Sequence, residues 1–536
     1  MKNEFLFLSL QKKRKEIGLG KMERLNKRMK LGTEIGSGSF GAVYLLGSDK
    51  VVKVCQCDRS DLVDYGRVRE CAAMALLNRS THPHFARLLS THRFSGASAL
   101  VLDRFDHNLG EQMTLSDQDI RTTFFAVANA VLYLHNRNLL HRDLKDRNVL
   151  VKRSCISLCD FGSVTSTHSH SSHSAAQSQF NGTSDICTLT HRAPEILLGG
   201  TDYTAAVDVW SLGVLLADMY LGTSLFWNYA EEHEADSDDD TEEEVRQTFH
   251  NICKCFGLAA MQSLSRYPLH SAYTAETVEF CPLLFQRRGI GLANYLQLRR
   301  RTVRRRSSDD LAQLCRPAAI PADAVNLLGR LLAVNPAERW SVAQLLLHPF
   351  FQGRVPSEPV VSCPVQRVQL TDFSTPHQTP YDRATVTSFF RHVARRLQWR
   401  NSHTLFGALD IAHRYICSSG SYVTVDLISI GAIAENLFEV QARELAEWQE
   451  ATGVEVAARD IKRAVQRVEF VLKHDLLLAT EWMYILAYFH DLAPTKEALH
   501  FAEDLLLASL LTQEHSNLGK HIISGRIVNV VRTVFP

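Results

Sequence analysis

Residues 141–148 (HRDLKDRN) and 160–162 (DFG) constrain this 536-residue chain more than any other feature. Transfer of a phosphoryl group depends on positioning and charge neutralisation rather than on covalent chemistry by the protein. Asp143 is suited to accept the proton of a substrate hydroxyl, and Lys145 to steady the moving phosphoryl group. The two segments therefore predict a phosphotransfer site with Asp143 as the catalytic base.

A glycine-rich segment predicts the phosphate-binding part of this site. It reads Gly36-Ser37-Gly38-Ser39-Phe40-Gly41-Ala42-Val43 and lies between two β-like runs. A lone G-x-G-x-x-G pattern also occurs at the strand-to-helix turn of dinucleotide-binding folds. Here a strand follows the glycines, which favours a hairpin whose main-chain N–H groups approach the phosphates of ATP, with Val43 against adenine.

Four charged or polar residues complete a predicted ATP–magnesium site. Lys53 lies on the next β-like run and is suited to neutralise the α- and β-phosphates. Glu70, on a helix predicted over about 60–79, can pair with Lys53 and hold it in place. Asn148 and Asp160 carry oxygen atoms, the ligands that Mg²⁺ prefers. We therefore expect ATP and Mg²⁺ as cofactors.

Residues 31–352 resemble the cyclin-dependent kinases, which are serine/threonine protein kinases. The likeness rests on residues 188–199 (TLTHRAPEILLG), on residues 68–70 (VRE) and on residues 331–352 at the domain end. Lys145 is typical of serine/threonine rather than tyrosine kinases. The resemblance implies an α+β, two-lobed protein kinase fold, with a small β-rich N-terminal lobe and a large helical C-terminal lobe. It also implies a buried ion pair between Glu195 and Arg339.

The same resemblance assigns further residues to the nucleotide site. It places Leu102 at the gatekeeper position and Asp103 and Phe105 at the hinge that binds adenine. It also adds Ile35 and Leu150 to the residues expected to bind ATP. The pattern Asp208-x-Trp210-Ser211-x-Gly213 belongs to the same family signature, without a role assigned to its members.

Activation by phosphorylation is a further implication of the resemblance. It places Thr183 at the activating threonine, where a phosphate carries about −1.5 to −2 charges and seeks an arginine cluster. Arg69 and Arg142 match two of the family's three phosphate-binding arginines, whereas Thr165 stands at the third position. We therefore expect phosphate capture here to be weaker than in the family.

Residues 381–536 are helical in pattern and resemble a cyclin box. Residues 404–415 (TLFGALDIAHRY) carry the likeness most clearly, although His413 stands where cyclins have aspartate. The lysine and glutamate with which cyclins contact their kinases fall near Asn436 and Val465, so a weak contact is expected. Two other interpretations stay open, a generic helical bundle and a DNA-binding cyclin fold. No dense basic patch with interleaved aromatic residues supports the latter.

Composition and charge indicate the surroundings of the two domains. A hydrophobic fraction of 45% and a net charge of +1 indicate a globular protein rather than a general nucleic-acid or membrane binder. Residues 1–30 form a basic arm, which favours a nuclear over a cytoplasmic location, and residues 353–380 form a proline-rich linker. The acidic run 231–244 and the arginine run 299–306 are both expected to be exposed loops.

These observations predict a serine/threonine kinase covalently joined to a cyclin-like domain that activates it in cis. The expected partners are protein substrates that carry Ser or Thr, with a preference for Pro at the next position, and neither a membrane nor a direct nucleic-acid contact is expected. Thr190 and His191 replace the family's Trp-Tyr near the pocket for that proline. The alternatives are an active kinase whose tail recruits substrates and a non-catalytic kinase scaffold. Phosphotransfer by residues 31–352 alone would separate recruitment from activation.

Overall fold

A computed structural model describes most of the chain. It covers residues 29–38, 41–56, 65–78, 82–94, 97–111, 115–137, 139–153, 155–166, 188–200, 204–226, 242–269, 289–306, 319–352, 354, 383–399, 402–438, 443–474, 476, 496–510, 524, 526–528 and 530–531. Ser39, Phe40 and Thr183 lie outside the described residues, as do most of the predicted arm and nearly all of the predicted linker.

In its described residues, the small lobe is a five-stranded antiparallel sheet in the order β1-β2-β3-β5-β4, accompanied by the helix α2. The elements are β1 (Glu34–Gly38), β2 (Gly41–Leu46), β3 (Lys50–Gln56), α2 (Tyr65–Leu77), β4 (Leu88–Phe94) and β5 (Ala97–Asp103). Side chains alternate along β3, as a strand requires. Val52 and Val54 pack with Ala99 and Val101 on one face, and Cys55 packs with Cys71 of α2 on the other.

The glycine-rich segment forms the hairpin predicted from the sequence, because β1 pairs antiparallel with β2. Gly41 has a φ of +133°, and a Cβ at this position would lie 2.2 Å from the carbonyl oxygen of Val54. Only glycine allows this close approach of two strands. The dinucleotide-binding alternative is excluded, since a strand rather than a helix follows the turn.

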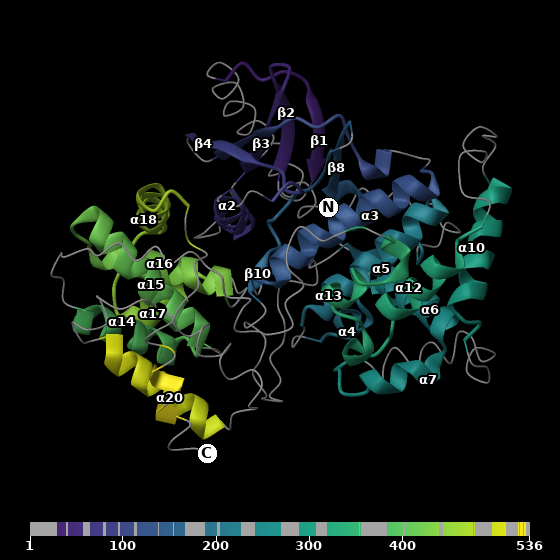
Figure 1. Cartoon of the computed structure of the whole chain (residues 1–536). Helices are drawn as coiled ribbons and strands as arrows, with labels where there is room; N and C mark the ends of the chain where they lie inside the picture. Colours follow the sequence, from purple (N-terminus) through teal and green to yellow (C-terminus); the bar gives the residue numbers. More distant parts are fainter. Residues whose placement is uncertain are drawn as a thin grey trace, which may run out of the picture.

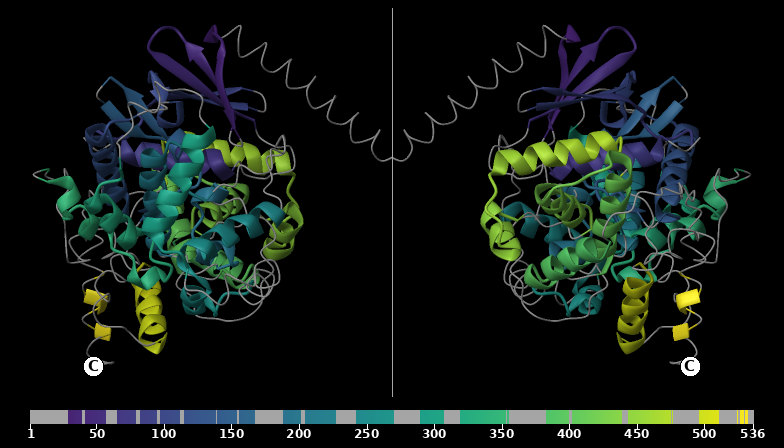
Figure 2. Two further views of the ribbon diagram at one scale, coloured as in Figure 1. Left: turned by 90° about the vertical axis from the view of Figure 1, so that its right-hand side faces the viewer. Right: turned by 90° about the vertical axis from the view of Figure 1, so that its left-hand side faces the viewer.

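The large lobe is mainly helical and is built around α3 (Asp117–His135) and α5 (Ala206–Leu221). Ser116 and Asp119 form a capping box that begins α3, and almost all of α5 is buried. This lobe also contains short strands: β6 (His107–Asn108), β7 (Leu139–Leu140), β8 (Val149–Lys152), β9 (Cys155–Leu158) and β10 (Thr165–Ser166). The remaining helices are α4 (Pro194–Leu197), α6 (Glu242–Phe256), α7 (Leu258–Met261), α10 (Leu292–Arg306), α12 (Ala322–Leu331) and α13 (Val342–Leu345). The α+β, two-lobed architecture is thus confirmed, with the sheet at one end of the molecule (Figures 1 and 2).

The ion pair predicted for the large lobe is also confirmed. Arg339 donates from Nη1 and Nη2 to the two carboxylate oxygens of Glu195, both at 2.7 Å. Both side chains are buried, so the planar guanidinium meets the carboxylate out of water. The pair fixes α4, which follows the activation segment, to the turn after α12.

The loop prediction was wrong for the arginine run and for the last three residues of the acidic run, whose residues 231–241 lie outside the described part of the chain. The arginine run 299–306 lies in α10, because the preceding turns bury Tyr295 and Leu296 and anchor a helix that the charges alone would not form. Arg299 also donates to the carbonyl oxygen of Ser224 at 2.6 Å. The end of the acidic run, residues 242–244, forms the first turn of α6, where carboxylates favour a helix N-terminus.

The region after the predicted linker is helical, as expected, in its described residues. It contains α14 (Arg383–Arg396), α15 (Ser402–Ser419), α16 (Thr424–Phe438), α17 (Leu445–Thr452), α18 (Ala458–Val471) and α20 (Lys496–Leu510). α16 is central: it packs against α15 and α18 and buries Ile428, Ile430 and Ile433. A side chain at Gly431 would meet the ring of Trp448 at 2.9 Å, so glycine allows α17 to approach.

The helical region lies beside the large lobe and below the sheet, with α16 and α18 next to α2 (Figure 1). None of the helices among the described residues is long and apolar enough to cross a membrane.

Candidate active site

Lys53 lies at the centre of a buried group of charges between the lobes. Its ammonium nitrogen is 2.8 Å from Oε1 of Glu70 on α2 and 3.0 Å from Oδ1 of Asp160. Burial lowers the pKa of Lys53, but the two carboxylates outweigh that effect and hold its pKa well above the usual value. The structure thus brings together three residues that are distant in the sequence and that were predicted to act together.

The loop predicted to carry the catalytic base positions Asp143 through four contacts. Oδ1 of Asp143 accepts hydrogen bonds from the main-chain N–H of Thr188 at 3.1 Å and from its hydroxyl at 3.0 Å. Oδ2 accepts from Nδ2 of Asn148 at 2.9 Å and lies 3.0 Å from Nζ of Lys145. Lys145 in turn donates to the hydroxyl of Thr188 at 2.8 Å, so the lysine, the carboxylate and the hydroxyl converge.

The surroundings of Asp143 keep its carboxylate ionised at neutral pH. Burial raises the pKa of this group, but the charge and hydrogen bond of Lys145 lower it, and Thr188 contributes in the same direction. The net result is a pKa below the usual range of aspartate. A carboxylate in this state can accept a proton from a hydroxyl at the moment of its attack.

Asp208 at the start of α5 holds the loop that carries Asp143. Its carboxylate oxygens accept from the main-chain N–H groups of His141 at 2.9 Å and Arg142 at 2.8 Å, and His135 contacts it at 2.9 Å. These hydrogen bonds overcome the effect of complete burial and lower the pKa of Asp208. Arg142 has a φ of +64°, an unfavourable backbone conformation for arginine that these bonds stabilise.

Phe161 fixes the position of the neighbouring Asp160. Its ring is fully buried and lies 5.9 Å from the ring of Phe85 and 5.5 Å from that of His141. Asp160 has a φ of +61°, which directs its carboxylate toward Lys53 while the next side chain enters the core. Aspartate tolerates this backbone region better than most residues.

The donor atoms of Asn148 and Asp160 fit a magnesium ion. Because Nδ2 of Asn148 donates to the main-chain oxygen and Oδ2 of Asp143, its oxygen Oδ1 points to the opposite side of the carboxamide. A carboxamide and a carboxylate oxygen beside a phosphate-binding lysine are hard ligands of the kind that Mg²⁺ uses with nucleotide phosphates.

The residues predicted to surround adenine come from both lobes. The register of β3 and β5 sets Val51 opposite Leu102 and Lys50 opposite Asp103. Leu102, Phe105 and Leu150 are half-buried and pack against the main core, whereas 52% of the side chain of Ile35 is exposed. These partly exposed apolar side chains are of the kind that binds a flat base.

Two residues of this site had no predicted role. Thr188 contacts both Asp143 and Lys145, and Asp208 holds the loop that carries them. Both belong to segments recognised in the sequence. Their positions in those segments were the available signal, but only the folded structure shows what each touches.

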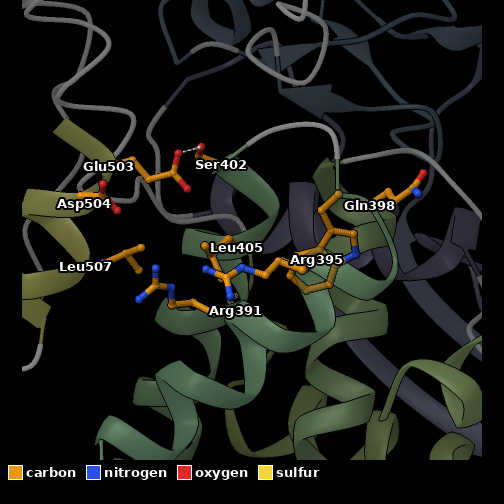
Figure 3. Close-up of a pocket in the computed structure, with 10 residues that line it drawn as sticks. Arg391, Arg395, Gln398, Ser402, Leu405, Glu503, Asp504 and Leu507 are labelled. Carbon is orange, nitrogen blue, oxygen red and sulfur yellow. Dashed lines mark hydrogen bonds between the residues drawn. The ribbon is translucent and has the colours of Figure 1, made fainter. Parts of the chain in front are cut away.

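A separate cavity of about 450 Å³ lies in the helical region (Figure 3). Arg391 and Arg395 of α14 approach it from one side, and Glu503 and Asp504 of α20 line the other. Ser402 donates to Glu503 at 2.9 Å across one end. Its lining residues all lie between 391 and 507, so it is no part of the nucleotide site.

The fold and this site together define a two-lobed phosphotransferase, and comparison with known proteins identifies its family. Residues 29–351 match the protein kinase domain, so the chain belongs to the protein kinase family. Members of this family use ATP with Mg²⁺.

Several curated proteins are similar over this part of the chain. Cyclin-dependent kinase F-4 of Oryza sativa subsp. japonica is 27% identical over 340 residues, which are 61% of this chain and 62% of that protein. A probable CTD kinase subunit alpha homolog of Encephalitozoon cuniculi is 33% identical over 202 residues, 36% of this chain and 57% of the relative. Mitogen-activated protein kinase 15 of Mus musculus is 29% identical over 342 residues, 61% of this chain and 54% of the relative. The chain thus spans little more than half the length of these relatives.

The contact between Lys145 and Asp143 predicts a change in pH dependence. Lys145→Ala removes the nearest cation, so burial dominates and the pKa of Asp143 rises. The acidic limb of the kcat/KM profile should then move to higher pH, and the maximal rate should fall. Lys152→Ala on β8 serves as the control with an unchanged profile. Identical acidic limbs in the Lys145→Ala variant and the wild type would contradict the assigned contact.

Proposed function

We propose that the chain is an ATP-dependent serine/threonine protein kinase of the cyclin-dependent kinase type, held in its active arrangement by its own C-terminal helical region. The observation that carries this proposal is the 2.8 Å ion pair between Lys53 and Glu70. Glu70 lies on α2, the helix against which α16 packs. Both the catalytic ion pair and the contact proposed to activate the kinase therefore involve α2.

The catalytic part follows from the positions of the charged groups. Lys53 offers three N–H donors and binds the α- and β-phosphates, while the glycine hairpin covers them. Asn148 and Asp160 would hold Mg²⁺, which would neutralise charge on the phosphates of ATP. A serine or threonine oxygen attacks the γ-phosphorus, its proton passes to Asp143, and the bond to the bridging oxygen breaks to leave ADP. Lys145 and Thr188 hold the carboxylate of Asp143 in the position from which it would accept this proton.

The activating part rests on contacts between α2 and the helical region. Arg67 donates to both oxygens of Glu469 on α18, at 2.9 and 3.1 Å. Arg69 donates to the main-chain oxygen of Asn436 on α16 at 3.0 and 3.1 Å. Thr91 on β4 also hydrogen-bonds His474 at 3.1 Å. These contacts hold the helix that carries Glu70 from its outer side, as expected of a cis-activator with a likeness to cyclins.

The contact at α18 was missed in the sequence because Arg67 and Glu469 are not positions at which cyclins are expected to meet a kinase. Both side chains are buried, with Glu469 fully so. Such a pair depends on both partners, because removal of one leaves an uncompensated charge out of water. At Asn436, near which the unmatched cyclin lysine would fall, the main-chain oxygen makes the contact.

The two alternatives are less well supported. A non-catalytic scaffold has no need of Lys53, Glu70, Asp143, Asn148 and Asp160 in hydrogen-bonded positions. A tail that only recruits substrates has no need of buried contacts with α2. A short peptide substrate distinguishes recruitment from activation, because it offers nothing for a distant docking surface to hold.

A preference for Ser or Thr followed by Pro is part of the proposal. It is supported by the likeness to cyclin-dependent kinases at residues 186–192. Within this segment burial lowers the pKa of His191 to about 4, so its ring is neutral at physiological pH. Ser211 of α5 donates to the carbonyl oxygen of His191 at 2.9 Å and fixes the turn. The neutral imidazole thus adds no charge to the segment that the resemblance places beside the residue after the target hydroxyl.

The role of Asp143 is tested by Asp143→Asn. The amide cannot accept the proton, and loss of a positioned base should lower kcat by about 10²–10⁴-fold. ATP binding, measured by calorimetry, should remain near the wild-type value. Asp460→Asn, a partly exposed residue of α18, is the control. Full turnover by Asp143→Asn would disprove the catalytic assignment.

The cis contact is tested by charge exchange at the buried pair. Breaking such a pair costs about 3–5 kcal/mol, so Arg67→Glu and Glu469→Arg should each lower kcat on a short peptide by at least ~10²-fold. The double variant Arg67→Glu/Glu469→Arg should regain much of the loss. Arg459→Glu, on an exposed position of the same helix, should leave turnover unchanged. Activity of Arg67→Glu equal to the wild type would rule out activation through this contact.

The proposed preference is tested with a peptide array that varies the position after the target hydroxyl. Peptides with Pro at this position should be phosphorylated at least ~10-fold faster than those with Ala. Equal rates for all residues at this position would contradict the preference and leave the kinase assignment intact.

A further inference from the structure

Two carbonyl oxygens at the C-terminal end of α16 accept hydrogen bonds from residues of the kinase region. The final four C=O groups of a helix have no partner within the helix, and the negative end of the helix dipole lies there. Here the oxygen of Asn436 accepts from Nε and Nη2 of Arg69, and the oxygen of Leu437 accepts from the hydroxyl of Thr165 at 3.5 Å. α16 therefore meets both α2 and the beginning of the activation segment with its negative end.

Arg69 connects this helix end to the catalytic residues. It directly precedes Glu70, and α2 is a regular helix over Tyr65–Leu77, so fixing Arg69 fixes the register of Glu70. Glu70 then holds Lys53, which in turn contacts Asp160. Only 8% of Arg69 is exposed, and the carbonyl oxygen compensates part of the cost of burying its charge.

The beginning of the activation segment is held by the same helix end. Thr165 belongs to β10, which pairs with β7 immediately before the loop of Asp143. The residue is fully buried, and its short neutral side chain reaches Leu437 where the related kinases were expected to have an arginine. The second arginine expected to bind phosphate, Arg142, donates from Nε to the oxygen of Ser163 at 2.6 Å.

We propose that the carbonyl end of α16 replaces the activating phosphate, so that phosphotransfer by this chain does not depend on phosphorylation of its activation segment. This inference rests on the proposed kinase function and deepens it. An activating phosphate links the helix that carries the glutamate to the activation segment by accepting hydrogen bonds from arginines. The oxygens of Asn436 and Leu437 supply acceptors to both elements without a modification. Arg69 is thus a positioning residue whose acceptor is part of the same chain.

The test uses the full-length protein before and after treatment with a protein phosphatase, with intact mass spectrometry to verify removal of every phosphate. The kcat on a short serine peptide should agree within ~2-fold between the two forms. Arg69→Gln, which cannot make the forked contact, should lose at least ~10-fold in kcat in both forms. Arg69→Lys, which keeps a charged donor, should recover part of that loss. Arg459→Gln, an exposed arginine of α18, is the matched control.

The outcomes separate this inference from the proposed function. A loss of 10-fold or more on phosphatase treatment of the wild type would overturn the inference, while the activity of the untreated protein would still support the kinase assignment. No phosphotransfer by either form would overturn the proposed function itself. Unchanged kcat in Arg69→Gln would overturn the positioning role. Thermal unfolding of each variant identifies a loss of fold, and the phosphatase comparison decides the matter without any variant.

Discussion

The buried ion pair between Lys53 and Glu70 is the interaction on which the rest of this structure depends. A lysine in the interior is tolerated only with partners close enough to offset its lost hydration. Glu70 reaches Lys53 at 2.8 Å only because α2 is packed against the sheet, and Asp160 adds a second carboxylate at 3.0 Å because Phe161 occupies the core. The nucleotide site thus requires a particular position of one helix.

Contact between α2 and the helical region buries further charged groups, and the helical region supplies acceptors for them. α2 carries two arginines, Arg67 and Arg69, on the side that faces the helical region, and both are buried there. The carboxylate of Glu469 and the oxygen of Asn436 accept hydrogen bonds from these groups. The carboxamide of Asn436 opposes docking, because among the described residues neither of its polar atoms has a hydrogen-bond partner, and such burial costs about 1–3 kcal/mol. Favourable charge pairing and an unsatisfied amide therefore act against each other at one interface. A covalent connection shifts this balance toward the docked state, because it raises the local concentration of the helical region.

The sequence predicted which charged residues would lie together in the site, because these residues belong to short, ordered segments. Asp143, Asn148 and Asp160 stand where the motifs place them, and Lys53 and Glu70 meet although 17 residues separate them in the chain. The interface was harder to predict. Arg67 and Glu469 are 402 residues apart, and a main-chain oxygen such as that of Asn436 leaves no signature in a sequence. The prediction of a loop over the arginine run was wrong for a related reason. Burial of two residues, Tyr295 and Leu296, stabilises a helix in a segment whose composition suggests a loop.

The most direct test of this account is to separate the two regions after they have folded together. A protease site placed within residues 353–380 allows the purified chain to be cut and its parts to be resolved by ion exchange. Once separated, the kinase region should turn over a short peptide at least ~10²-fold more slowly than the uncut chain. Activity should return as the purified helical region is added back. A separated kinase region with the same kcat as the uncut chain would show that the helical region does not hold Glu70 on Lys53.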